Sequence, residues 1–264
     1  PAKDDDGATL IRDILDELDR VFAEFPDADG TDALPDWRTA ARQAFDRVAP
    51  LLSDRSRGGH VRRCHGDLHL RNIVLIDGEP VPFDALEFDE TLGTCDVLYD
   101  LAFLVMDMGH RGLGEAACRT LSRYLLDTHG REDGGLAAFP LFLSLRSAIR
   151  AMVLLQTDAA KQTPGASAEE IAAYLGEALA ALAPAPVRLI AVGGFSGTGK
   201  TILARSLAAG IGARPGAIHL STDAERKAVR DVEMTEHLSR EAYTDTARGA
   251  VYDRLFARAE TILT

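Results

Sequence analysis

A glycine-rich octapeptide in the last third of the chain has the residue types of a phosphate-binding loop. It follows the pattern G-x-x-x-x-G-K-[ST], and its residues are Gly194, Phe195, Ser196, Gly197, Thr198, Gly199, Lys200 and Thr201. Glycines let backbone N–H groups turn inward around an anion, and the N-terminus of the following helix adds positive potential. In such a loop the lysine reaches the β- and γ-phosphates, and the last hydroxyl holds Mg²⁺. The pattern therefore predicts a site for Mg-ATP or a related nucleotide, with Lys200 on phosphate and Thr201 on the metal.

The segments on either side of this loop predict the elements that such a motif needs. The apolar run 189–192 predicts a short buried strand, and 202–209 predicts a helix. A bare glycine turn between strand and helix would leave the lysine and threonine without a role. A plain turn is therefore the weaker interpretation of the octapeptide.

A second set of candidate catalytic residues lies far upstream, in the pattern H-x-D-x-x-x-x-N from His65 to Asn72. In kinase catalytic loops with this pattern the aspartate accepts the proton of the attacking hydroxyl, and the asparagine binds Mg²⁺. Asp67 and Asn72 take these positions. The apolar run 73–76 and the turn signal Asp77-Gly78 predict a β-hairpin, and Asp84 follows it as the candidate for a further metal ligand.

The motifs of this first half resemble the aminoglycoside phosphotransferase family, a branch of the kinase-like fold. The resemblance is carried by 65–72, Phe83-Asp84 and 99–103. Joined to a phosphate-binding loop, the module is similar to bacterial proteins described as bifunctional aminoglycoside phosphotransferase/ATP-binding proteins. The similarity runs from about Val61 to Tyr252.

The resemblance implies roles for particular residues. Asp67 would be the catalytic base, and Asn72 and Asp84 would bind Mg²⁺. Asp100 would be a buried aspartate that braces the catalytic loop, and His65 would support the loop by hydrogen bonding to backbone.

Residues that follow the second apolar run of the C-terminal half are similar to the acceptor site of P-loop kinases. The run 217–220 predicts a strand that leads into Asp223. By that similarity Asp223 is a candidate general base, and Arg226 and Lys227 are candidate contacts to substrate or phosphate. Asp223 is equally well interpreted as the N-cap of a helix that begins at Ala224.

Several residues of these segments have an alternative interpretation. His69 beside Asp67 gives the pattern H-x-D-x-H of a metal hydrolase, but no further His or Cys follows at ligand spacing. Asp96 is best interpreted as the cap of a helix over 97–108. Arg146 and Arg150, four residues apart, could form an anion site, although a structural role is the preferred interpretation.

Composition restricts the class of protein. The formal net charge of −12 argues against a general nucleic-acid binder. The three scattered cysteines indicate a reducing compartment without a disulfide framework. The start of the sequence is acidic, and the longest apolar run, 101–106, is too short to cross a bilayer. We therefore expect a soluble cytoplasmic protein without membrane contact.

The predicted fold is mixed α/β. Residues 1–183 are expected to form the mainly helical C-lobe of a kinase-like phosphotransferase, 184–186 a stiff linker, and 187–264 a partial P-loop domain with a parallel sheet. Helices are predicted over 10–25, 35–52, 97–108, 113–126, 139–155, 169–182 and 202–209.

A kinase site also needs a glycine loop and a strand lysine, yet Lys3 is the one lysine before His65. We therefore expect that the N-terminal nucleotide-binding lobe of a kinase is missing. We also expect that the chain is either truncated at both ends or degenerate.

These patterns together predict transfer of the γ-phosphoryl group of Mg-ATP to a hydroxyl of a small molecule. One alternative is an ATP-binding regulatory protein whose first half is a pseudokinase-like scaffold. A weaker alternative is phosphorylation of polynucleotide 5′-hydroxyl ends, against which the acidic balance argues. The motifs specify neither the acceptor nor an oligomeric state.

Overall fold

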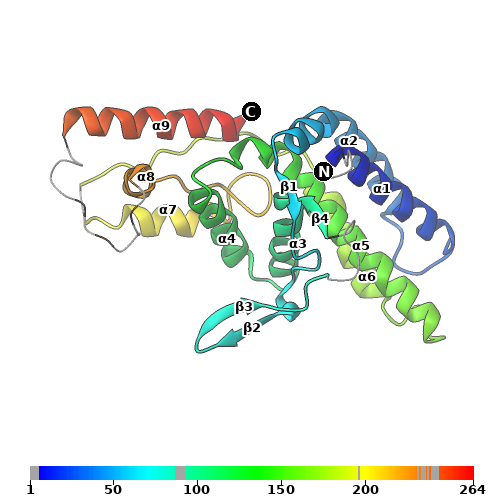
Figure 1. The fold of residues 1–264 in the computed structure, drawn as a ribbon. Helices are drawn as coiled ribbons and strands as arrows, with labels where there is room; N and C mark the ends of the chain where they lie inside the picture. The colour runs from blue at the N-terminus through cyan, green and yellow to red at the C-terminus, as the bar shows by residue number, and fades with distance from the viewer. Residues whose placement is uncertain are drawn as a thin grey trace. The chain divides into compact units, whose positions relative to one another are not determined.

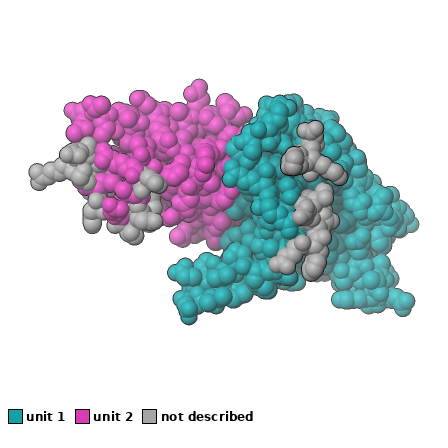
Figure 2. Space-filling view, in the orientation of Figure 1, with its two compact units in different colours: residues 1–112, 138–184 teal, residues 113–137, 185–264 magenta. Residues whose placement is uncertain are grey.

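Residues 113–137 pack with the C-terminal segment rather than with the helices that flank them in sequence. The structure is a computed structural model that describes residues 6–86, 93–195, 197–230, 232, 236, 238 and 244–264. Unit 1 comprises Pro1–Gly112 and Ala138–Pro184, and unit 2 comprises Leu113–Ala137 and Ala185–Thr264 (Figure 2). The sequence-based boundary at 184–186 therefore coincides with one junction between the units, while residues 113–137 belong to unit 2.

Unit 1 is mainly helical (Figure 1). Its elements in chain order are α1 (Gly7–Ala23), α2 (Leu34–Arg57), β1 (Val61–Arg63), the 3-10 turn η1 (Leu70–Asn72), β2 (Ile73–Ile76), β3 (Glu79–Pro82), β4 (Thr94–Asp96), α3 (Val97–His110), α5 (Phe139–Ala160) and α6 (Ala168–Ala181). The helices predicted in this unit all form, with ends that differ from the expected ones by a few residues.

Helix α5 is the centre of the unit 1 core. It packs against α1, α2, α3 and α6, and its Phe142 and Leu145 are fully buried. Trp37, predicted to be a core residue, is also fully buried, and its indole N–H donates to the Ser144 hydroxyl at 2.9 Å. Burial of large apolar side chains on a central helix is the main stabilising term in such a bundle.

Arg146 of α5 is part of this core and does not form an anion site. Its guanidinium lies 3.9 Å from the centroid of the Tyr99 ring and 4.8 Å from that of Phe103. Its Nε donates to the Tyr99 carbonyl at 3.2 Å. Two aromatic faces and a carbonyl therefore compensate its burial, which supports the structural interpretation of this arginine.

The strands of unit 1 form two small antiparallel pairs, β1 with β4 and β2 with β3. The β2–β3 hairpin has the predicted turn, because Asp77 and Gly78 both have positive φ, 52° and 85°. Positive φ at both central residues is the requirement of a type I′ hairpin turn. The hairpin follows directly from η1, so it carries the chain away from the catalytic-loop pattern and back to Asp84.

Unit 2 consists of helices around irregular segments (Figure 1). Its elements are α4 (Gly114–Asp127), most of the 3-10 segment η2 (Asp133–Ala138), α7 (Lys200–Ala208), α8 (Thr222–Val229) and α9 (Asp245–Leu263). Helix α4 packs against both α7 and α8. The predicted helices 113–126 and 202–209 correspond to α4 and α7.

The parallel sheet predicted for the P-loop half is wrong for the described residues, which contain no strand between 187 and 230. Leu189 and Ile190 are 69% and 52% exposed, so this segment is not a buried strand. In the second predicted strand, the N–H of Ala217 donates to Ala208 at the end of α7, and that of His219 to the Ser122 hydroxyl of α4. A parallel strand needs neighbours that take its backbone groups, whereas here helices take them.

One segment, Asp133–Ala160, is long and apolar enough to cross a membrane by length and composition. Its most apolar window has a mean hydropathy of 1.6, and 67% of that window is buried within the structure. The core helix of a soluble protein has the same properties, and α5 packs in that way. The three cysteines are free thiols.

Candidate functional site

The catalytic-loop pattern of unit 1 is held by buried carboxylates of α3. The Asp100 carboxylate accepts the backbone N–H groups of His65 at 3.1 Å and Gly66 at 2.8 Å. Two turns further along α3, Asp107 accepts the N–H of Leu70 at 2.9 Å. Asp100 and Asp107 are 7% and 5% exposed. Charged acceptors in such surroundings make strong hydrogen bonds, so α3 fixes both ends of the loop.

Glycine is required at position 66 of this loop. Gly66 has φ of 83°, and a Cβ there would come within 2.6 Å of the Leu86 side chain. Both the left-handed backbone and the close approach exclude larger residues. The glycine therefore allows the loop to turn under the segment that carries Asp84.

The segment that carries Asp84 is tied to the loop by backbone hydrogen bonds. Phe83 donates its N–H to the carbonyl of Asn72 at 3.0 Å. Nε2 of His65 lies 2.9 Å from the Phe83 carbonyl, and the His65 carbonyl accepts from Leu86 at 2.9 Å. Asp84 itself is exposed and has φ of 60°. Its position next to Phe83 places it beside the loop residues Asn72 and His65.

Asp67 and Asn72 are in direct contact. The amide nitrogen of Asn72 donates to the main-chain carbonyl and to Oδ2 of Asp67, both at 3.0 Å. A carbonyl can only accept, so the nitrogen must face Asp67, and the amide oxygen, which is the metal-binding atom, is turned away. Asn72 is 8% exposed, while the Asp67 side chain is 40% exposed. The loop thus presents an accessible carboxylate beside a fixed amide.

The metal-hydrolase interpretation of His65, Asp67 and His69 finds no support in the described part of the chain. Among those residues no group of three or more His, Cys, Asp or Glu side chains is placed to hold a metal ion. Nδ1 of His69 accepts the N–H of Arg71 at 3.2 Å instead. The histidine therefore serves as the N-cap of η1.

The backbone of the unit 2 glycine loop turns at three glycines with positive φ. Gly194, Gly197 and Gly199 have φ of 149°, 79° and 83°, and Gly199 immediately precedes α7. Lys200 is the first residue of α7, and its Nζ donates to the Phe195 carbonyl at 2.6 Å. Ser196 lies outside the described residues.

Space around the glycine loop is restricted at Gly194. A Cβ at that position would come within 3.2 Å of the Thr198 hydroxyl and 3.7 Å of the Lys200 side chain. The Thr198 hydroxyl donates to the Phe195 carbonyl at 2.8 Å. The Lys200 side chain thus lies close to Gly194, in a loop whose positive φ values favour glycine.

Helix α8 carries the other candidate residues of unit 2. Ser221 caps the helix, because its hydroxyl accepts the N–H of Ala224 at 3.2 Å. Asp223 lies in the first turn, so it is not the N-cap. Its carboxylate, 58% exposed, lies 3.5 Å from Nζ of Lys227 and 3.9 Å from the guanidinium of Arg226. The cap alternative for Asp223 is therefore excluded, and the base assignment stays a prediction.

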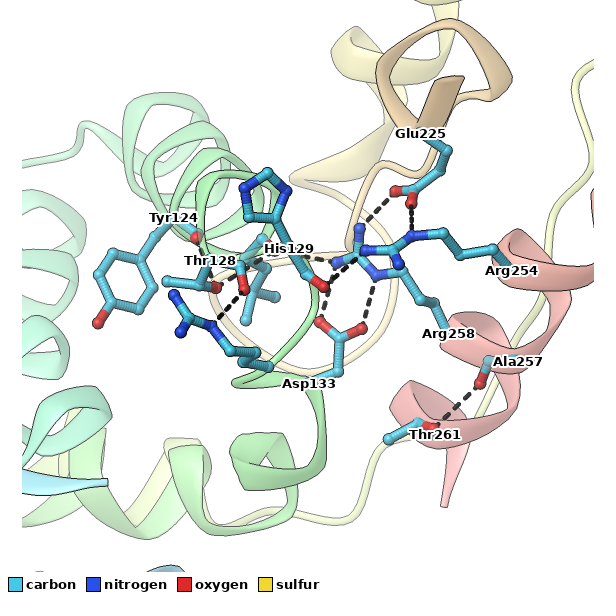
Figure 3. A network of polar contacts seen from close by, with 11 residues as sticks. Tyr124, Thr128, His129, Asp133, Glu225, Arg254, Ala257, Arg258 and Thr261 are labelled. Carbon is cyan, nitrogen blue, oxygen red and sulfur yellow. Dashed lines mark hydrogen bonds and ion pairs between the residues drawn. The ribbon is translucent and has the colours of Figure 1, made fainter. Parts of the chain in front are cut away.

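A buried charge network holds α8 to the rest of unit 2 (Figure 3). The Arg258 guanidinium of α9 donates to both oxygens of Asp133, at 2.7 and 2.9 Å, and to Glu225 of α8. Glu225, fully buried, also accepts from Arg254 at 3.0 Å. Burial lowers the pKa of Arg258, but its hydrogen bonds and charge interactions with Asp133 and Glu225 outweigh this, so the pKa is raised.

Sequence reasoning missed this network. Its partners are separated by up to 125 residues and come from three separate segments of the chain. Helix periodicity gives no signal for such pairing, since each charged residue is compatible with an exposed helix face. Glu225 is two residues from Asp223, so the network also fixes the helix that presents the candidate base.

Comparison with known proteins supports the nucleotide-binding part. The family model described as an AAA domain matches residues 189–264, which include the glycine loop. Curated relatives are an uncharacterized protein of Mycobacterium bovis and uncharacterized proteins of two Mycobacterium tuberculosis strains. Each is 34% identical over 181 residues, which cover 69% of this chain and 35% of the relative. No solved structure gives a significant match.

The chain thus spans about a third of the length of the curated relatives that it matches, 35% in each case. The family match includes Lys200 and Thr201 but not the catalytic-loop pattern of unit 1. The match therefore supports a P-loop nucleotide-binding segment of kinase or ATPase type in residues 189–264. The kinase-like assignment of the first half stays a prediction.

Proposed function

We propose that the protein is an ATP-dependent phosphotransferase that moves the γ-phosphoryl group of Mg-ATP to a hydroxyl of a small molecule. The observation that carries the proposal is Lys200, positioned by the glycine turn at the first residue of α7, inside the AAA-domain match. An ammonium group and free backbone N–H groups at a helix start are a site for a polyphosphate.

The residues of the loop fit a nucleotide phosphate. Lys200 and the loop N–H groups would hold phosphate oxygens, and the exposed Thr201 hydroxyl would hold Mg²⁺. The bound metal would neutralise charge that develops on the transferred group. The role of the protein is then to position the reactants, which accounts for most of the catalysis in phosphoryl transfer.

The acceptor side of the reaction has two candidate bases. In unit 1, Asp67 would take the hydroxyl proton, with Asn72 and Asp84 as metal ligands, once a nucleotide lobe is supplied to this half. The contact between Asp67 and Asn72 and the brace from Asp100 support this assignment. In unit 2, Asp223 would act as the base, with Arg226 and Lys227 near the phosphate.

A regulatory ATP-binding protein is the second candidate function, and one observation favours it. The Asp223 carboxylate lies beside the cations of Arg226 and Lys227 on its own helix. A carboxylate engaged by two cations of its own helix is less available to an acceptor hydroxyl. In this case ATP would be bound and hydrolysed without an acceptor. The net charge of −12 continues to disfavour polynucleotide ends as acceptors.

Acceptor-dependent formation of ADP separates the two functions. We would measure ADP release from Mg-ATP with a panel of hexoses, amino sugars and amino alcohols, in the parent chain and in Asp67→Asn and Asp223→Asn. A phosphotransferase gives turnover that rises with one acceptor and falls at least about ten-fold in one of the variants. Asp127→Asn, on an exposed face of α4, is the matched control. Turnover that no acceptor raises, and that neither variant lowers, would establish the regulatory function instead.

A further inference from the structure

The His69 ring is fixed in one orientation and one tautomer. Its Nδ1 accepts the backbone N–H of Arg71 at 3.2 Å. A backbone N–H can only donate, so Nδ1 carries a lone pair and the proton of the neutral ring lies on Nε2. The ring also packs edge-on against Phe103, with centroids 5.2 Å apart and an interplanar angle of 68°. The side chain is 12% exposed.

The protonated nitrogen of this ring lies close to the candidate base. Nε2 of His69 lies 3.4 Å from Oδ2 of Asp67, the same oxygen that accepts from the Asn72 amide at 3.0 Å. Among the contacts within the described residues, both side chains therefore approach the same carboxylate oxygen. Oδ1 is then the oxygen of this 40% exposed side chain that can receive a proton from an acceptor hydroxyl.

We propose that His69 is a positioning residue for Asp67: its Nε2–H holds Oδ2 and turns Oδ1 toward the acceptor. The inference rests on the proposed function, in which Asp67 takes the hydroxyl proton. The Arg71 N–H directs the ring proton to Nε2, since a proton on Nδ1 would face another donor.

Two substitutions separate the functions of the two ring nitrogens. In His69→Asn the side-chain oxygen can replace Nδ1 as the acceptor for Arg71, but the donor toward Asp67 is lost. In His69→Gln the longer side chain can place an N–H near the position of Nε2. A residue that only caps η1 would tolerate Asn better than Gln, whereas a residue that positions Asp67 would tolerate Gln better than Asn.

The first measurement is NMR of the full chain with nitrogen-labelled histidine, in alkaline buffer where imidazole is neutral. The His69 signals, assigned by their loss in His69→Asn, should show the Nε2–H tautomer. In Asp67→Ala the Nε2 proton should move upfield while the Nδ1 shift stays in place. An Nδ1–H tautomer, or an Nε2 proton that is insensitive to Asp67→Ala, would overturn the proposal whatever the activity.

The second measurement is acceptor-dependent turnover with the most active compound of the panel. His69→Asn should lower kcat about ten-fold, as expected for loss of one hydrogen bond to a charged group, with the KM for Mg-ATP unchanged. His69→Gln should recover most of that loss. Equal kcat in His69→Asn and the parent chain would refute the positioning role and leave the proposed function intact. A parent chain without acceptor-dependent turnover would refute the proposed function, and the NMR result would then decide whether His69 contacts Asp67 as described.

Discussion

The two candidate loops of this protein are held in opposite ways. The catalytic-loop pattern of unit 1 is fixed by contacts from distant parts of the chain, with Asp100 and Asp107 bonding residues 34 to 37 positions away. The glycine loop of unit 2 is fixed by contacts that span three to five residues, from Thr198 and Lys200 to the Phe195 carbonyl. The first loop therefore depends on the tertiary fold, and the second on its own backbone chemistry.

This difference shows which site tolerates change in its surroundings. A loop that depends on local turns keeps its shape as long as its glycines remain. A loop that depends on a buried carboxylate loses its shape when one distant residue changes. In order of decreasing expected effect, the substitutions remove the tertiary frame of unit 2, the brace of unit 1, the local glycine turn and one half-buried imidazole.

The largest effect is expected for Arg258→Met, which leaves the buried carboxylates of Asp133 and Glu225 without their shared partner. Removal of one member of a buried ion pair costs about 3–5 kcal/mol. Hydrogen exchange should show that the free energy of opening of α8 and α9 falls by about that amount. The control Arg248→Ala breaks an exposed pair on the same helix and should change the opening free energy by less than about 1 kcal/mol.

Trp37 provides an internal reference for this experiment, because it is the one tryptophan of the chain and lies in the unit 1 core. Its fluorescence should report an unchanged unfolding transition in Arg258→Met. Protection in α8 and α9 that equals that of the parent chain would show that the network contributes no stability.

Asp100→Asn tests the brace of the unit 1 loop. The amide can accept only one of the two N–H groups that the carboxylate accepts, and an unsatisfied buried donor costs about 1–3 kcal/mol. Hydrogen exchange at His65 and Gly66 should accelerate, while Lys200→Ala should leave those two amides unchanged. Unchanged exchange at Gly66 in Asp100→Asn would mean that the loop does not depend on α3.

Gly199→Ala tests whether the glycine loop depends on its local backbone. At φ of 83° an alanine is strained by about 1–2 kcal/mol, so affinity for Mg-ATP should fall about ten-fold. The matched control is Gly176→Ala in α6, where a Cβ meets open space. It should stabilise unit 1 by about 0.5–1 kcal/mol. Equal nucleotide affinity in both variants would contradict the local account.

The smallest effect is expected from His219 of unit 2. Burial, and to a lesser degree the charge of Arg205, lower its pKa from the ordinary value of 6.5. Below pH 6.5 the unfolded chain therefore binds more protons at this residue than the folded chain does. By linkage the stability of unit 2 falls as pH decreases through this window. Denaturation followed at several pH values should show that the stability of unit 2 decreases less steeply in His219→Gln than in the parent chain. An equal decrease in both would show that His219 does not contribute to the pH dependence.

The sequence predicted the local features of this protein and missed those that depend on distant contacts. The type I′ turn at Asp77-Gly78 and the seven helices follow from residue types within a few positions. The strand at 189–192 was predicted from apolar residues alone, yet a strand exists only through neighbours that take its hydrogen bonds. The Arg258 network and the packing of 113–137 with unit 2 have no local signal either.

The same distinction holds within the candidate site. The motif located Asp67 and Asn72, but the pairing of both His69 and Asn72 with one oxygen of Asp67 requires the folded loop. Asp223 could be a cap or a base by sequence, and only the position of Ser221 showed which residue caps α8. Whether Asp223 acts as a base depends on an acceptor that neither motif identifies.

The most direct test of the account is calorimetric titration of Mg-ATP into the full chain and into Lys200→Ala, Asp84→Ala and the control Lys161→Ala. We predict binding that is lost in Lys200→Ala, with affinity reduced by about a hundred-fold or more, and that is retained in Lys161→Ala. Under this account Asp84→Ala still binds one molar equivalent of Mg-ATP at the glycine loop. Binding that survives in Lys200→Ala, or that is lost only in Asp84→Ala, would contradict the assignment of the nucleotide to the loop of unit 2.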